Sequence, residues 1–123
     1  MYRVYDSEKK QWITDDVCLT SSGKLFKIRK FVFGWFKFLS ELSTDRYICH
    51  RYIELEDKNG IPIYEGDYLE AHIDEDKTVI GLVAFAPELS GYVILCADNN
   101  EFYTLGTGIC EYIQKIGDIF GDL

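Results

Sequence analysis

The stretch RYIELEDKNGIPIYEGDYLE, residues 51–70, decides the fold of this chain. Asn59 and Gly60 accept positive φ angles at little cost, so Asp57-Lys58-Asn59-Gly60 predicts a tight reversal. Apolar residues occur at alternate positions before this turn, at Ile53 and Leu55, and resume directly after it. The stretch therefore predicts a β-hairpin.

A second turn signal, Tyr64-Glu65-Gly66-Asp67, follows directly and is expected to start the next strand. The carboxylates of Glu65 and Asp67 lie two residues apart, and on one face of a strand such a pair could bind a cation or act in acid–base chemistry. A turn explains the motif more completely, because Gly66 permits the backbone geometry and both carboxylates can accept backbone N–H bonds. We therefore interpret the motif as structural.

The rest of the chain continues as short apolar runs separated by turn residues. A first hairpin is expected from residues 2–4 and 11–13, and further strands from residues 24–33, 46–55, 68–73, 78–85, 92–96 and 101–105. This pattern predicts a mostly β fold: an N-terminal β-rich extension over residues 1–45 and a C-terminal SH3-like small β-barrel over residues 46–123, together in one compact unit.

Three segments are less regular. Residues 35–43 place apolar side chains at both strand and helix spacings, so both structures stay open there. Asp98-Asn99-Asn100 predicts a reversal of the chain. Residues 108–120 fit a helical face, but their glycines and dense Ile and Tyr content favour a final strand, preceded by a helical turn near residues 106–111.

The charge of the chain is divided unequally. Residues 1–52 carry ten Lys/Arg against six Asp/Glu, a net charge of +4, whereas residues 53–123 carry three against fifteen, a net charge of −12. The acidic half favours basic partners and repels phosphate backbones, although solubility alone also explains a negative net charge.

No apolar segment approaches the roughly 20 residues needed to span a bilayer, and the first residues lack the apolar core of a signal peptide. We therefore expect a cytoplasmic protein without membrane association. In that reducing compartment the four cysteines, Cys18, Cys49, Cys96 and Cys110, are expected to be buried thiols.

Familiar catalytic and metal-binding patterns are missing. Neither C-x-x-C nor H-x-x-x-H spacing occurs, and Cys49 and His50 are neighbours whose side chains would face opposite sides of a strand. The G-x-S-x-G motif of a nucleophile elbow is absent, and Gly106-Thr107-Gly108 lacks the Lys-Ser/Thr of a phosphate-binding loop. We therefore expect no catalytic residues, no metal and no cofactor, and hence not an enzyme.

The stretch KLFKIRKFVFGWFKF, residues 24–38, is the most suggestive surface in the sequence. It holds five basic residues, no acidic ones and six aromatics, a composition that can neutralise phosphates and stack bases. In a strand Lys27 and Arg29 would lie on the same side as Phe31 and Phe33. The candidate nucleic-acid-binding residues are Lys24, Lys27, Arg29, Lys30 and Lys37, and the alternative is an ordinary strand whose aromatics fill the core while its lysines reach solvent.

Protein binding or self-association is the other interpretation, and we favour it. Exposed Trp35, Phe36 and Phe38 would form an apolar patch of the kind that marks interfaces. The acidic residues Glu70, Asp74, Glu75 and Asp76 would form a second contact, suited to a basic partner or to the basic half of another copy.

Several motifs together are similar to the YopX-like family of phage and prophage proteins. They are Tyr2-Arg3-Val4-Tyr5-Asp6 with Trp12, the turns at residues 57–60 and 63–67, and the closing Ile116-Gly117-Asp118-Ile119. The resemblance covers essentially the whole chain and implies a mostly β protein with an SH3-like C-terminal part, encoded by a phage or an integrated element in a bacterial host. It implies no catalytic residues.

Overall fold

The computed structural model describes residues 2–31, 34–96 and 101–121, and of Phe36 the backbone but not the side chain. Strands form most of this described chain, which confirms the predicted mostly β fold. The chain divides between Cys49 and His50 into two compact units, here called the N-terminal unit and the C-terminal unit. The predicted boundary lay between residues 45 and 46.

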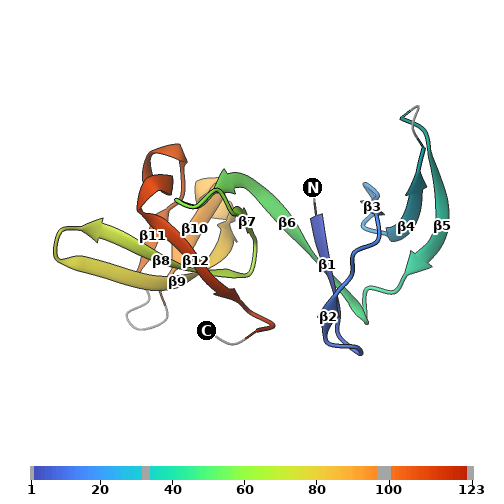
Figure 1. Cartoon of the computed structure of the whole chain (residues 1–123), viewed down its shortest axis with the longest axis horizontal. Helices are drawn as coiled ribbons and strands as arrows, with labels where there is room; N and C mark the ends of the chain where they lie inside the picture. Colours follow the sequence, from blue (N-terminus) through green and yellow to red (C-terminus); the bar gives the residue numbers. More distant parts are fainter. Residues whose placement is uncertain (1, 32–33, 97–100, 122–123) are drawn as a thin grey trace. The chain divides into compact units, whose positions relative to one another are not determined.

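The N-terminal unit contains two groups of antiparallel strands (Figure 1). In the first hairpin, Tyr5 pairs with Trp12 across the two strands, and their rings meet edge to face at 5.1 Å. The second group is a three-stranded sheet in the order β3-β4-β5. The elements of this unit are β1 (Tyr2–Asp6), β2 (Gln11–Trp12), β3 (Val17–Leu19), β4 (Leu25–Lys30), β5 (Phe36–Leu42) and the start of β6 (Tyr47–Glu56).

The sequence left both a strand and a helix open for residues 35–43, and the structure forms strand β5 there. Lys27 of β4 pairs with Ser40, and the next residue, Ile28, pairs with Phe38, so Leu39 is an extra residue in β5. This β-bulge interrupts the two-residue alternation of side chains. The interruption explains why the apolar spacing fitted both a strand and a helix.

The C-terminal unit is built on a five-stranded antiparallel sheet in the order β11-β10-β9-β8-β12. The later part of β6 pairs separately with β7, Tyr52 opposite Tyr64. The closed SH3-like barrel stays a prediction. The further elements are β7 (Pro62–Tyr64), β8 (Asp67–Asp74), β9 (Lys77–Ala86), β10 (Gly91–Leu95), β11 (Phe102–Thr104) and β12 (Ile113–Asp118), with 3₁₀ turns η1 (Pro87–Leu89) and η2 (Thr107–Tyr112).

The two faces of the five-stranded sheet differ in burial. Alternate residues of β8, β9 and β10 form the inner face, where Leu69 and Ile94 are completely buried and Val83 nearly so. Ile53, Ile63 and Ile113 also belong to this core. The residues between them point to the outer face, because side chains alternate along a strand.

The predicted hairpin at residues 57–60 is confirmed. The backbone N–H of Gly60 donates to the carbonyl of Asp57 at 3.0 Å, and that of Asp57 donates to the carbonyl of Ile61 at 2.9 Å. Gly60 has a φ of +77°, whereas Asn59 stays at negative φ, so Gly60 alone supplies the left-handed conformation expected of both. Glu54 takes a φ of +64° where the β6–β7 register shifts.

The end of the chain also follows the prediction. Residues 113–118 form strand β12, paired with β8, and the preceding 3₁₀ turn η2 occupies the position expected for a helical turn. The reversal predicted at Asp98-Asn99-Asn100 lies outside the described residues.

Candidate functional site

The basic side chains predicted to bind nucleic acid lie on strands β4 and β5, with Lys24 just before β4. Two of them are partly neutralised, because Lys27 Nζ lies 3.3 Å from Asp15 and Lys30 Nζ lies 3.8 Å from Asp16. Arg29 and Lys37 are cross-strand neighbours and both are exposed. The positive surface that remains is therefore smaller than the sequence predicted, and it is centred on Arg29 and Lys37.

Aromatic side chains lie beside this pair at the tip and outer strand of the hairpin. Trp35 is 74% exposed, and Phe31 and Phe38 are each about half exposed. The backbone N–H of Phe31 donates to the carbonyl of Trp35, so Phe31 belongs to the connecting turn and not to the strand carrying Lys27 and Arg29. Phe33, the fourth member of the predicted platform, lies outside the described residues.

The ring of Phe38 is partly exposed and also packs within the hairpin. It meets that of Phe26 edge to face at 5.0 Å, while Leu39, the bulge residue beside it, is 47% exposed. Phe38 pairs with Ile28, whereas Lys37 pairs with Arg29, so Phe38 lies on the opposite face of the hairpin from these two cations. We define the aromatic hairpin surface as the exposed side chains Arg29, Phe31, Trp35 and Lys37. Of the predicted interface residues, Trp35 belongs to it, Phe38 does not, and the side chain of Phe36 is not described.

The acidic residues predicted to form a second contact lie along β8 and in the turn that follows it. Asp74, Glu75 and Asp76 form the exposed turn between β8 and β9, where Asp74 Oδ1 accepts the backbone N–H of Asp76 at 2.9 Å. Glu70 lies further along β8, opposite Ile80. It belongs to the outer face of the sheet and does not line the same pocket.

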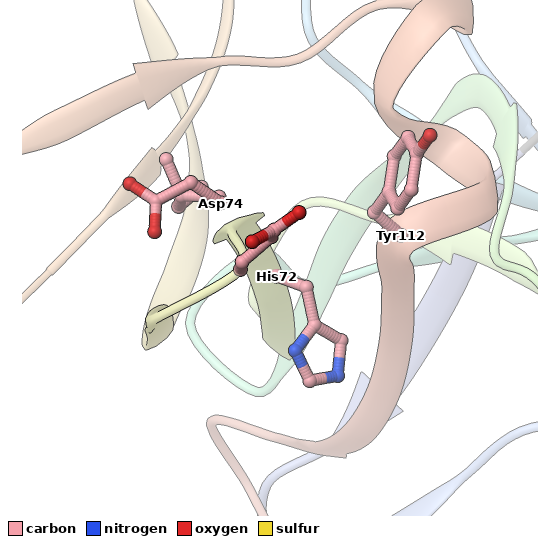
Figure 2. Close-up of a pocket in the computed structure, with 5 residues that line it drawn as sticks. His72, Asp74 and Tyr112 are labelled. Atoms are coloured by element: carbon pink, nitrogen blue, oxygen red, sulfur yellow. The ribbon is translucent and has the colours of Figure 1, made fainter.

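An open pocket of about 540 Å³ adjoins this acidic turn. Figure 2 shows Tyr112 across the pocket from His72 and Asp74; Ile73 and Glu75 complete its lining. A hydrogen bond to Glu111 raises the pKa of Tyr112, so its phenol stays neutral, and His72 Nδ1 lies 2.9 Å from Thr78 Oγ1. Two carboxylates facing an aromatic ring favour a cationic group such as a Lys or Arg side chain.

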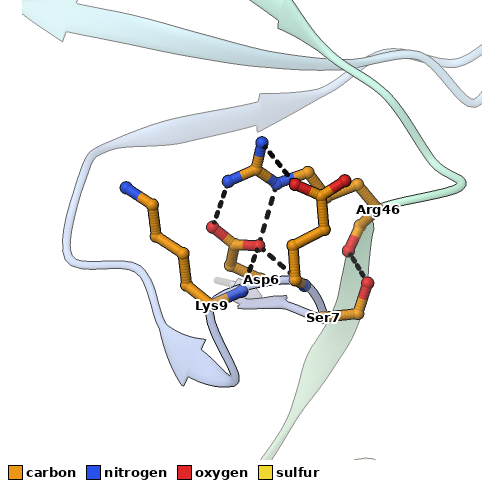
Figure 3. A network of polar contacts seen from close by, with 5 residues as sticks. Asp6, Ser7, Lys9 and Arg46 are labelled. Atoms are coloured by element: carbon orange, nitrogen blue, oxygen red, sulfur yellow. Dashed lines mark hydrogen bonds and ion pairs between the residues drawn. The ribbon is translucent and has the colours of Figure 1, made fainter.

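Asp6, which is buried, and Arg46, which is partly exposed, form an ion pair that sequence reasoning missed (Figure 3). The guanidinium donates from Nε to Oδ1 and from Nη2 to Oδ2, both at 2.9 Å, and a further ion pair joins Arg46 to Glu8. The hydrogen bond from Arg46, aided by the backbone N–H groups of Lys9 and Glu8, lowers the pKa of Asp6 to about 2. No local spacing could reveal the pair, because its members are 40 residues apart.

This ion pair is structural. Ser7 reinforces it, since both its hydroxyl and its backbone N–H donate to the carbonyl oxygen of Arg46. Asp6 is 2% exposed and its two carboxylate oxygens are occupied by these donors. A carboxylate enclosed in this way fixes the first hairpin to the residue before β6 and has no access to a substrate.

The carboxylates of Glu65 and Asp67 also act within the fold. Glu65 Oε1 accepts the backbone N–H of Arg51 at 2.9 Å, and Asp67 Oδ2 accepts that of Tyr64 at 2.8 Å. Asp67 is completely buried, and its other oxygen lies 3.4 Å from Lys115 Nζ. These contacts agree with the structural interpretation of the motif.

Gly66 and Asp57 connect the two turn motifs to the rest of the unit. Gly66 has a φ of +82°, donates its N–H to the carbonyl of Val83 and accepts the N–H of Ile119. Asp57 is 5% exposed and accepts three backbone N–H bonds, one of them from Lys115 in β12. Lys58 donates its backbone N–H to the carbonyl of Ile113, so the 57–60 turn lies along the outer edge of β12.

The cysteines differ from the expectation of four buried thiols. Cys96 is buried in the core, but Cys18, Cys49 and Cys110 are only half-buried. Burial raises the pKa of Cys110, whose thiol lies 3.4 Å from the carbonyl oxygen of Gly106. Within residues 2–31, 34–96 and 101–121, no group of three His, Cys, Asp or Glu side chains is placed to hold a metal ion.

The family model described as YopX protein matches residues 1–122. The chain belongs to the YopX family. A search of curated proteins found no match. None of the described helices is long and apolar enough to cross a membrane.

Two solved structures resemble this YopX-family chain. One is protein yopX from Bacillus subtilis, 17% identical, with a TM-score of 0.62 over 97% of this chain and 91% of that one. The other is protein EF1440 from Enterococcus faecalis, 19% identical, with a TM-score of 0.54 over 97% of this chain and 92% of that one. At these identities the likeness concerns the fold alone.

Proposed function

We propose that this YopX-family chain is a non-enzymatic protein-interaction module, encoded by a phage or prophage and acting in the cytoplasm of the bacterial host. The observation that carries the proposal is the exposure of Trp35, 74% of whose surface faces solvent at the tip of the β4–β5 hairpin. A large aromatic side chain loses its hydrophobic stabilisation when it stays in water, and exposed tryptophans are frequent anchors of protein interfaces. Phe31, which is 46% exposed and hydrogen-bonds to Trp35 through the backbone, extends this surface.

The acidic pocket beside the β8–β9 turn supports a second contact of the same kind. Asp74 and Glu75 supply negative charge and Tyr112 supplies an aromatic ring, an arrangement suited to a basic side chain of a protein partner. The phage origin and the cytoplasmic location rest on the family resemblance.

Site-specific photo-cross-linking tests the proposal. A photoreactive aromatic residue is placed at position 35 in one variant and at position 89 in a second variant, which serves as the control. Leu89 is 48% exposed and lies in η1 of the C-terminal unit, not in the hairpin of the N-terminal unit. We expect irradiation in host cells to join position 35, and not position 89, to a protein. Trp35→Ser should weaken binding of that protein at least tenfold. Cross-linking that is equal at both positions, or absent at position 35, would contradict the proposal.

A second candidate function, nucleic-acid binding, is favoured by one observation. Arg29 and Lys37 lie opposite each other on paired strands, an arrangement of like charges that costs stability unless an anion lies between them. Phosphate is such an anion, and Trp35 beside the pair could stack on a base.

Fluorescence anisotropy with labelled single- and double-stranded oligonucleotides at low and moderate salt tests this alternative. A nucleic-acid binder should lose affinity steeply as salt is added. The double variant Arg29→Glu/Lys37→Glu should also bind much more weakly than wild type. Lys24→Glu, which changes a cation at the other end of β4, should have a much smaller effect. An apolar protein interface should hold or tighten with salt. Absence of binding at low salt would exclude the alternative.

A further inference from the structure

The outer face of the C-terminal sheet carries a row of apolar side chains that the sequence did not reveal. Tyr68 of β8 pairs with Leu82 of β9, Leu82 with Leu95 of β10, and Leu95 with Phe102 of β11. Directly paired residues share one face of a sheet, so these four side chains form a continuous line across four strands. Ile80, two residues before Leu82, adjoins the line on the same face.

This outer apolar row, comprising Tyr68, Ile80, Leu82, Leu95 and Phe102, is open to solvent. Ile80 is 49% exposed, Leu95 44% and Phe102 54%, while Tyr68 and Leu82 are half-buried. The hydrophobic core packs against the opposite face through Leu69, Val83 and Ile94. A row of this kind on a sheet face that the core does not use is expected to bind another apolar surface.

Charge indicates which surface fits. The C-terminal unit, residues 50–123, carries four Lys/Arg against fifteen Asp/Glu, a net charge of −11, and Glu70 lies directly opposite Ile80 at the margin of the row. Two such units packed row to row would therefore repel each other. The occupant of the row should be apolar in its centre and basic at its margin.

The aromatic hairpin surface of the N-terminal unit has that composition. Phe31 and Trp35 are its apolar part, and Arg29 and Lys37 are its basic margin. The N-terminal unit, residues 2–49, carries nine Lys/Arg against six Asp/Glu, a net charge of +3, so hairpin-to-hairpin contact would again bring like charges together. Contact between a hairpin and a row is complementary in both polarity and charge.

We propose that this chain self-associates by docking the aromatic hairpin surface of one copy on the outer apolar row of a second copy. The inference rests on the proposed interaction function and names its partner. Taking about 200 Å² for each large apolar side chain, the exposed fractions of Phe31, Trp35, Ile80, Leu95 and Phe102 amount to roughly 500 Å² in total. That area is small for a permanent complex, so the association should be reversible and dependent on concentration.

Sedimentation of two complementary variants tests the contact. Trp35→Ser/Lys37→Glu changes only the hairpin, and Leu95→Thr/Phe102→Thr changes only the row while keeping β-forming residues. We expect wild type to associate between about 1 µM and 1 mM, and each variant alone to associate at least tenfold more weakly. An equimolar mixture should regain association, because the row variant retains an intact hairpin and the hairpin variant an intact row. Leu89→Thr and Lys24→Glu, matched exposed substitutions elsewhere on the two units, should behave as wild type.

A second measurement uses a chain changed only at position 35, so its result does not depend on whether the variants above fold correctly. Protein with the photoreactive residue at position 35 is prepared with ¹⁴N and with ¹⁵N, mixed and irradiated. Cross-links between position 35 and the segments containing Ile80, Leu95 or Phe102 should include mixed-isotope species, which arise only between copies.

Three results would overturn the inference. They are a wild type that stays monomeric over the whole concentration range, variants that associate as wild type does, and a mixture that fails to regain association although both variants give wild-type circular dichroism spectra. If position 35 cross-links in cells to another protein while the purified chain is monomeric, the self-association fails but the proposed function stands. If position 35 gives no cross-links in either experiment, both fail.

Discussion

Asp57 is the residue whose replacement most directly tests how the turn motif stabilises the C-terminal unit. Its Oδ1 accepts the backbone N–H groups of Asn59 at 2.8 Å and Ile61 at 2.9 Å, and its Oδ2 accepts that of Lys115 at 2.9 Å. Burial raises the pKa of Asp57, but these three bonds together outweigh it and hold the pKa below its ordinary value. The carboxylate is therefore charged in the folded protein and joins the turn to strand β12.

The expected cost of Asp57→Ala follows from these contacts. A hydrogen bond to a charged group contributes about 1.5–3 kcal/mol, and the two donors within the turn can recover part of this from water once the side chain is gone. The backbone N–H of Lys115 lies in a strand and recovers less of this free energy from water. We expect a loss of about 3–5 kcal/mol, a large part of the roughly 4–11 kcal/mol typical of a unit of about 74 residues. Asp57→Asn keeps the shape and should cost about 2–3 kcal/mol, because its NH₂ group must face one of the donors.

Urea unfolding followed by far-ultraviolet circular dichroism measures these changes, and amide hydrogen exchange locates them. Tryptophan fluorescence is unsuitable here, since Trp12 and Trp35 both lie in the N-terminal unit. The matched control is Asp74→Ala, because Asp74 accepts one N–H bond in an exposed turn and its loss should cost less than about 1 kcal/mol. If Asp57→Ala costs no more than this control and leaves the Lys115 amide protected from exchange, the assigned role of the carboxylate is wrong.

Three further predictions concern other parts of the fold. Because Arg46 lowers the pKa of Asp6 to about 2, below the unfolded value of about 3.9, this pair should stabilise the N-terminal unit above pH 4 and lose that contribution as the pH falls towards 2. Tryptophan-monitored urea midpoints should show this acid loss in wild type, and a similar loss in Asp6→Asn would argue against it. Gly66→Ala should cost about 2–4 kcal/mol, because a Cβ would lie 2.6 Å from His50 Cε1 at a φ of +82°. Gly23→Ala, at a φ of +85° but with no atom within 4 Å, should cost only about 1 kcal/mol, and equal losses would show that steric contact is not the cause. Leu69→Ala on the inner face should cost about 2–5 kcal/mol by thermal or urea unfolding, whereas Leu95→Ala on the outer face should cost less than about 1 kcal/mol; the reverse order would contradict the assigned faces.

Features that depend on neighbouring residues could be predicted from the sequence. The 57–60 hairpin and the turn at Gly66 were predicted because glycine accepts positive φ wherever the chain requires it. The mostly β fold and the final strand followed from apolar alternation between such turns. Residues 35–43 stayed ambiguous for a local reason as well, since the bulge at Leu39 breaks the alternation on which the prediction depends.

The candidate surfaces were only partly predictable. The sequence placed five cations and the exposed aromatics in one stretch, but Asp15 and Asp16, which engage Lys27 and Lys30, belong to an earlier segment. Of the acidic residues predicted to form a second contact, Asp74 and Glu75 line the pocket, whereas Glu70 lies earlier on β8, opposite Ile80.

The sequence by itself determined which turns form, which segments are strands and how charge is divided between the two halves of the chain. Only the tertiary structure decided the Asp6–Arg46 ion pair, the bond from Lys115 to Asp57 and the line from Tyr68 to Phe102. The physical reason is that turn conformations depend on a few adjacent residues, whereas these contacts depend on the register of strands far apart in the chain. Register is set jointly by the packing of the whole core, and a shift of one residue would move Leu95 to the inner face and Ile94 to solvent.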